Sequence, residues 1–136
     1  MSTDYLESLQ LFINTFVERQ SLDRLAYLLS KRTRYHDFLH ELTHDFGTFN
    51  HSLIVHKGAN IYNTTKVMSL MGLSMKSVQY AYLIGKSPRF SDGDMSSSID
   101  LLDDVIGSMT DSIVFLPKKL CAYYEGHEGF GLILKS

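Results

Sequence analysis

The stretch from His36 to His51, reading HDFLHELTHDFGTFNH, holds four of the six histidines of the chain. Apolar residues around it keep helical spacing, and Gly47 is typical of the residue that follows a helix. Histidines four residues apart on a helix lie about 40° apart around the axis, so His40 and His44 can converge on one metal ion. Glu41 lies about 100° from His40, close enough to act as a general base on water bound to that ion. This spacing is compatible with the chemistry of a metal-dependent hydrolase, which is one of two interpretations of these histidines.

Residues 40–44, His-Glu-Leu-Thr-His, resemble the H-E-x-x-H pattern of zinc metalloproteases. Gly47 extends the resemblance to the first part of the metzincin signature, over about a dozen residues of the chain. The resemblance implies zinc as cofactor and a third histidine three residues after the glycine. That position holds Asn50, so His51, one residue later, is the best candidate for the third ligand. Other donors that could take its place are His56, His127, Glu125 and Glu128.

A second interpretation of the same histidines needs no metal. His36, His40 and His44 fall in one row along the predicted helix, at the border between its apolar face and solvent, where an apolar ring with a polar tip is stable. His36 and His44 lie about 12 Å apart along the axis and cannot share an ion. On this interpretation the chain has no cofactor.

Charge and composition narrow the classes of partner. With 13 basic and 15 acidic residues among 136, the net charge of −2 gives no general attraction to nucleic acid or to anionic lipid. The one basic cluster, at residues 31–34, is more typical of a solvated bend. Nucleic acid is therefore not an expected partner.

The location of the protein is predicted from its cysteine and its apolar runs. Cys121 is the single cysteine, so no internal disulfide can form and a reducing compartment is expected. Asp4 and Glu7 stand where a secretion signal would carry basic residues, and no run approaches the roughly 18 apolar residues of a membrane span. We expect a cytoplasmic protein without a membrane segment.

Hydrophobic periodicity predicts one α+β domain over residues 1–136. Helices are expected at about 4–19, capped by Asp4, and at 22–29, capped by Ser21; a third, capped by Thr33, or a continuation of the second, runs to about 46. Expected elements beyond these are a strand at 51–57 closed by residues 58–60, a short helix at 64–71, a strand at 78–85, an amphipathic helix capped by Ser97, and strands at 113–116, 120–125 and 130–135. The predicted fold is an N-terminal helical pair or triplet packed on a mostly antiparallel sheet of four or five strands, with one further amphipathic helix before a C-terminal three-stranded meander.

Two functional hypotheses follow from these residues. The first is a small non-catalytic protein that binds another macromolecule, most simply another protein, as a regulator or inhibitor does; eight tyrosines suit such an interface. The alternative is a zinc-dependent hydrolase with His40, His44 and His51 as ligands and Glu41 as base. We favour the non-catalytic hypothesis, and the sequence leaves the partner and the oligomeric state open.

Overall fold

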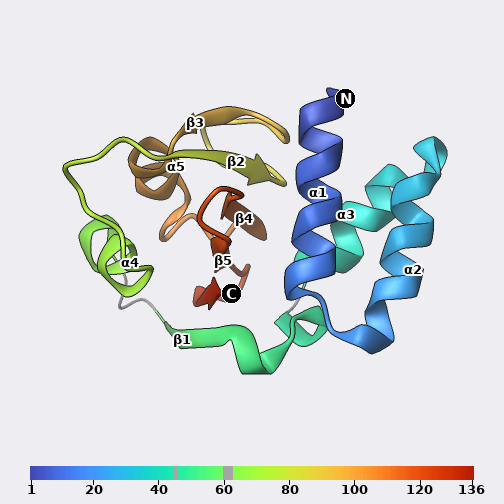
Figure 1. Ribbon diagram of the computed structural model, residues 1–136, viewed down its shortest axis with the longest axis horizontal. Helices are drawn as coiled ribbons and strands as arrows, with labels where there is room; N and C mark the ends of the chain where they lie inside the picture. The colour runs from blue at the N-terminus through green and yellow to red at the C-terminus, as the bar shows by residue number, and fades with distance from the viewer. Residues whose placement is uncertain (45, 60–62) are drawn as a thin grey trace.

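A single antiparallel sheet runs through the middle of the fold (Figure 1). Its strand order is β1-β6-β5-β4-β2-β3. The computed structural model describes residues 1–44, 46–59 and 63–136. Within these residues the sheet has six strands: β1 Ile54–Ala59, β2 Tyr80–Ile84, β3 Met95–Ser97, β4 Ser112–Leu116, β5 Cys121–Glu125 and β6 Phe130–Lys135. The strands β4, β5 and β6 form the expected meander.

Helices cover both faces of this sheet (Figure 1). Their bounds are α1 Thr3–Phe16, α2 Arg19–Ser30, α3 Tyr35–Thr43, α4 Thr64–Leu70 and α5 Ser98–Val105. The first three pack on one face as the predicted triplet, and α4 and α5 pack on the other. The predicted α+β fold is confirmed.

The alternation of side chains along each strand divides the core into two clusters. Ile113 and Phe115 of β4 pack with α1, α2 and α3, whereas Val114 and Leu116 pack with α4 and α5. Because helices cover both faces of the sheet, β4 is buried along its whole length, and a strand in this position carries a nearly continuous apolar run.

The predicted caps of the first helices are wrong. The Ser2 hydroxyl accepts the backbone N–H of Tyr5 and caps α1, in place of Asp4. Helix α2 begins at Arg19, so Ser21 lies inside its first turn, and among the described residues no side chain caps its N-terminus. Val17, just before it, is extended and forms a bridge with Phe49. Thr33 lies inside a 3₁₀ turn, Arg32–Arg34, that separates α2 from α3.

Two strand predictions also need correction. Residues 51–53 form a 3₁₀ turn capped by Asn50, so β1 begins at Ile54 and continues through Gly58 and Ala59, which were expected to close it. Residue 60 of that closure lies outside the described residues. No strand was predicted at Met95–Ser97, where β3 lies, and among the described residues this strand raises the strand count above the predicted four or five.

Candidate functional site

Three imidazole rings stack in a column at the end of α3. The His40 ring stacks on the His44 ring, with 4.6 Å between centroids and 24° between planes. The His44 ring stacks in turn on His127, with 5.2 Å between centroids and 14° between planes. His40 and His44 are neighbours one helical turn apart, as their spacing predicts, while His127 comes from the turn between β5 and β6.

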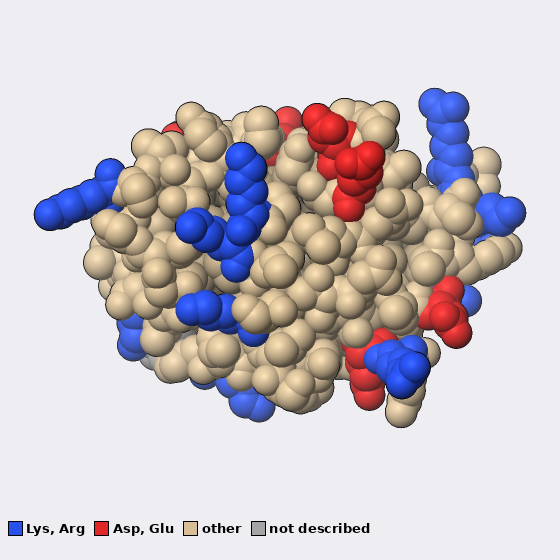
Figure 2. Space-filling view, in the orientation of Figure 1, with Lys and Arg blue, Asp and Glu red and all other residues tan. Residues whose placement is uncertain are grey.

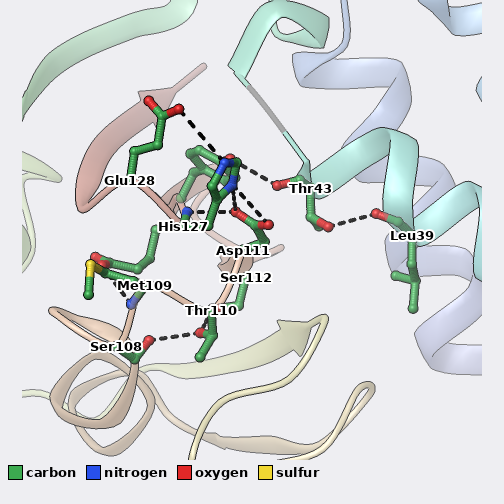
Figure 3. A network of polar contacts seen from close by, with 11 residues as sticks. Leu39, Thr43, Ser108, Met109, Thr110, Asp111, Ser112, His127 and Glu128 are labelled. Carbon is green, nitrogen blue, oxygen red and sulfur yellow. Dashed lines mark hydrogen bonds and ion pairs between the residues drawn. The ribbon is translucent and has the colours of Figure 1, made fainter.

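A buried hydrogen bond brings these two segments together. Tyr124 of β5 donates its hydroxyl to the backbone carbonyl of Thr43, at 2.8 Å. The Thr43 hydroxyl donates to the Leu39 carbonyl one turn earlier in α3, at 2.7 Å (Figure 3). Since Thr43 immediately precedes His44 and Tyr124 is three residues before His127, this bond sets the two histidines side by side.

Asp111 lies against His127 from the loop between α5 and β4 (Figure 3). Its Oδ1 accepts the backbone N–H of His127 at 2.7 Å. The His127 Nδ1 lies 2.9 Å from Oδ1 and 3.1 Å from Oδ2. The Glu128 carboxylate approaches the Nε2 of the same ring at 3.8 Å. Two carboxylates thus flank the His127 ring.

The loop that presents Asp111 has an unusual backbone. Met109 and Asp111 both have left-handed φ angles, 54° and 53°, which residues with side chains seldom adopt. The loop is fixed by buried Glu125, whose carboxylate accepts the backbone N–H of Met109 at 3.1 Å and the Tyr123 hydroxyl at 2.6 Å. A chain of hydroxyl groups adds further contacts along the loop, through Ser108, Thr110 and Ser112. These contacts hold the backbone on both sides of Asp111.

His44, Asp111 and His127 together form a possible metal-binding group. Their ligand atoms all lie within 4.8 Å of one another. In the ranges 1–44, 46–59 and 63–136, no other three histidine, cysteine, aspartate or glutamate side chains meet this criterion. Two imidazoles and one carboxylate are a donor set that zinc accepts.

The residues expected to act with His44 lie elsewhere. His40 stacks against His44 but is outside the group, and His51 lies in the 3₁₀ turn before β1. The Glu41 carboxylate accepts Nε of Arg24 with both oxygens, each at 2.9 Å, and Nη2 of Arg24 at 2.7 Å. The hydrogen bond with Glu41 raises the pKa of the Arg24 guanidinium. Zinc binding by His40, His44 and His51, with Glu41 as base, stays a hypothesis.

Two members of the group have a weak or absent signal in the sequence. His127 is recognisable as a donor at a strand end, and it was one of the possible third ligands. Asp111 has no comparable signal, since a single aspartate before a strand is ordinary. Its role depends on the left-handed loop and on the pairing of β4 with β5, which places Ser112 opposite Glu125.

A second candidate site is an apolar groove of about 640 Å³, which we call the Tyr80 groove. It lies between the outer face of α1, the start of β2 and the turn between β4 and β5. Its lining residues are Asp4, Glu7, Ser8, Leu11, Val78, Gln79, Tyr80, Ala81, Tyr82, Met95, Leu116, Pro117, Lys118 and Lys119. Four of them are large apolar side chains left open to solvent: Leu11 38%, Val78 65%, Tyr80 63% and Met95 61% exposed.

The course of the strands explains why the groove stays open. Tyr82 of β2 pairs with Phe115 of β4, but beyond this pair β4 turns away at Pro117, which has no backbone N–H for the ladder. Among the described residues, no strand pairs with the start of β2 on that side, and the side chain of Tyr80 is exposed to solvent.

The Tyr80 groove has charged residues on two of its walls, acidic on one and basic on the other. Asp4 and Glu7 stand on the α1 wall, and Lys118 and Lys119 stand on the turn. Figure 2 shows basic and acidic side chains scattered over one face with uncharged residues between them. On this face, the described basic side chains do not form the continuous surface that is typical of nucleic-acid-binding proteins.

No model of a known family, no curated protein and no solved structure matches the chain. Within its described residues, no helix has the length and apolar character needed to cross a membrane. Conclusions about function therefore depend on the two sites themselves.

Proposed function

We propose that this protein is a non-catalytic binding protein, that its partner is another protein, and that the partner docks in the Tyr80 groove. The observation that carries the proposal is the gathering of exposed Leu11, Val78, Tyr80 and Met95 along one groove. Single exposed apolar side chains are ordinary on a folded protein, but a contiguous patch is typical of an interaction site. Tyrosine and methionine are also enriched in protein interfaces.

The charges of the groove favour a second copy of the chain as the partner. The α1 wall is acidic, through Asp4 and Glu7, and the turn is basic, through Lys118 and Lys119. A two-fold axis along the groove brings the acidic wall of one molecule against the basic turn of the other. Two-fold dimers are the commonest oligomers, and their interfaces need this kind of self-complementary surface.

The size of the groove limits the affinity we expect. Its lining comprises 14 residues, fewer than the roughly 20–30 per partner found in interfaces of standard size. Weak and transient complexes fall in this smaller class. We therefore propose a reversible dimer that forms as the protein concentration rises.

Sedimentation velocity over a range of protein concentrations tests the proposal. We expect the sedimentation coefficient of the wild type to rise with concentration and that of Tyr80→Asp to stay at the monomer value. The matched control is Tyr27→Asp, because Tyr27 is 54% exposed on α2 and lies outside the groove. A wild type that remains a monomer throughout, or a dimer that tolerates Tyr80→Asp as well as Tyr27→Asp, would contradict the proposal.

A charge exchange tests the pairing of the two walls. Glu7→Lys alone and Lys118→Glu alone should each weaken self-association, because each places like charges across the interface. An equimolar mixture of the two variants should associate again, since opposite charges then face each other at both ends. Mixtures no more associated than either variant alone would exclude the two-fold arrangement.

The proposal includes a cytoplasmic location. Its support is the single thiol of Cys121, which is free and buried, as is usual for proteins of reducing compartments. Reversible self-association through an apolar groove needs no cofactor.

A further inference from the structure

We infer that His44, Asp111 and His127 form a binding site for a divalent transition-metal ion, and that zinc fits it best. Two imidazole nitrogens and one carboxylate oxygen are donors that zinc and its neighbours accept. Calcium and magnesium prefer oxygen donors throughout, so this set favours a transition metal over either of them. The site shares His44 with the predicted set of His40, His44 and His51, and His127 was one of the alternative third donors. It lies outside the Tyr80 groove.

The distances within the group suit an ion of this size. Zinc lies about 2.0–2.2 Å from its nitrogen and oxygen ligands, which places neighbouring donor atoms of a tetrahedral site roughly 3.3 Å apart. The donor atoms here lie within 4.8 Å of one another, so they need to approach by no more than roughly 1.5 Å. His44 and His127 are exposed, and rotation of their rings can close this distance without displacing the core.

The backbone conformation of the loop positions the Asp111 carboxylate beside His127. The left-handed conformation of Asp111 is one that aspartate, asparagine and glycine adopt more easily than other residues, and it directs the carboxylate toward His127. Strained backbone of this kind is often found where a side chain has a functional task. Binding exchanges the direct contact of the Asp111 carboxylate with the His127 ring for contacts of both with the ion.

The ion would join three segments that are distant in the chain. His44 ends α3, Asp111 precedes β4, and His127 lies in the turn between β5 and β6. Three protein ligands leave one tetrahedral position for water. Because the unfolded chain does not hold these residues together, zinc should bind the folded state preferentially and raise its melting temperature.

Equilibrium dialysis of the full chain against zinc chloride, together with thermal unfolding, tests the inference. The protein should carry no added histidine tag. We expect one zinc per chain and a higher melting temperature with zinc. His44→Gln, Asp111→Asn and His127→Gln should each weaken zinc binding by at least about tenfold, because each removes one of three ligands. Asp111→Asn is the most informative, since asparagine accepts left-handed backbone and its side-chain oxygen can still accept the His127 N–H.

The controls separate this site from the ligand set predicted by the motif. Under our inference, His51→Gln and Glu41→Gln should bind zinc as the wild type does. A wild type that takes up no zinc at micromolar concentrations overturns the inference. So does zinc binding that is lost in His51→Gln but retained in His127→Gln, since the ion would then belong to the motif. Circular dichroism of each variant shows that lost binding does not reflect lost folding.

Discussion

Tyr5 of α1 donates its hydroxyl to Oδ1 of Asp92, in the loop between β2 and β3, at 2.5 Å. Tyr35 at the start of α3 donates to Oδ2 of the same carboxylate, also at 2.5 Å, and the backbone N–H of Gly85 donates to Oδ1 at 2.9 Å. One carboxylate thus connects two N-terminal helices to the sheet. The pKa of both phenols is raised above the ordinary value of 10.0. Burial is the largest cause, and the adjacent Asp92 carboxylate is the next.

These raised pKa values predict a loss of stability in alkali. The contribution of Tyr5 and Tyr35 to the free energy of unfolding is fully present below pH 10.0 and falls as the pH rises above it. The reason is that above this pH the phenols of the unfolded chain release protons that those of the folded chain retain. Urea unfolding between about pH 8 and 11 measures this decline in the free energy of unfolding. The double variant Tyr5→Phe, Tyr35→Phe should be less stable at pH 8 and decline less steeply. If the free energy of unfolding declines with pH equally steeply in this variant and in the wild type, Tyr5 and Tyr35 are not the cause of the decline.

The bond from Tyr124 to the Thr43 carbonyl makes a separate prediction. Tyr124→Phe removes a buried donor and leaves the Thr43 carbonyl without this partner, which should lower the free energy of unfolding by about 1–3 kcal/mol. Urea unfolding near neutral pH measures the change. Tyr27→Phe, with its exposed ring on α2, is the control and should have little effect. If the two variants are equally stable, the bond does not hold α3 against the sheet.

The fold could be predicted where the information was local. The helix at α5 has its Ser97 cap and its apolar stripe within one segment, and the meander shows its turns at residues 117–119 and 126–129. Strand β3 has no such local signal, because Met95–Ser97 is short and partly polar. It is a strand because it pairs with residues 80–82, which only the folded chain brings beside it.

The candidate sites depend even more on contacts between distant segments. The neighbouring positions of His40 and His44 follow from the helical period, and the structure confirms them. The approach of His127 to His44 requires the bond from Tyr124 to Thr43, and that of Asp111 requires a left-handed loop. The Tyr80 groove likewise exists because β4 turns away from β2, which no period within β2 could indicate.

The left-handed backbone of Met109 predicts a stabilising substitution. Left-handed φ costs a non-glycine residue roughly 1–2 kcal/mol, while glycine loses roughly 0.5–1 kcal/mol more than other residues through its freedom in the unfolded chain. Met109→Gly should therefore raise the free energy of unfolding by up to about 1 kcal/mol, since the Met109 side chain is half exposed and its N–H remains available to Glu125. The matched control is Met75→Gly, an exposed methionine without a left-handed φ, which should destabilise the protein. A loss of stability as large as that of Met75→Gly would show that the Met109 side chain itself holds the loop.

The thiol of Cys121 in β5 lies between β4 and β6 in the sheet and faces α4 and α5. Burial raises its pKa to about 11, although Lys135 and Lys119 act in the opposite direction. Only about one thousandth of the thiol is then ionised at pH 8, and the thiolate is the form that attacks disulfide reagents. We expect the folded protein to react with a colorimetric disulfide reagent far more slowly than the protein in guanidinium chloride. Comparable rates in the two conditions would mean that the thiol is accessible, and that the face of the sheet beneath α4 and α5 opens readily in solution.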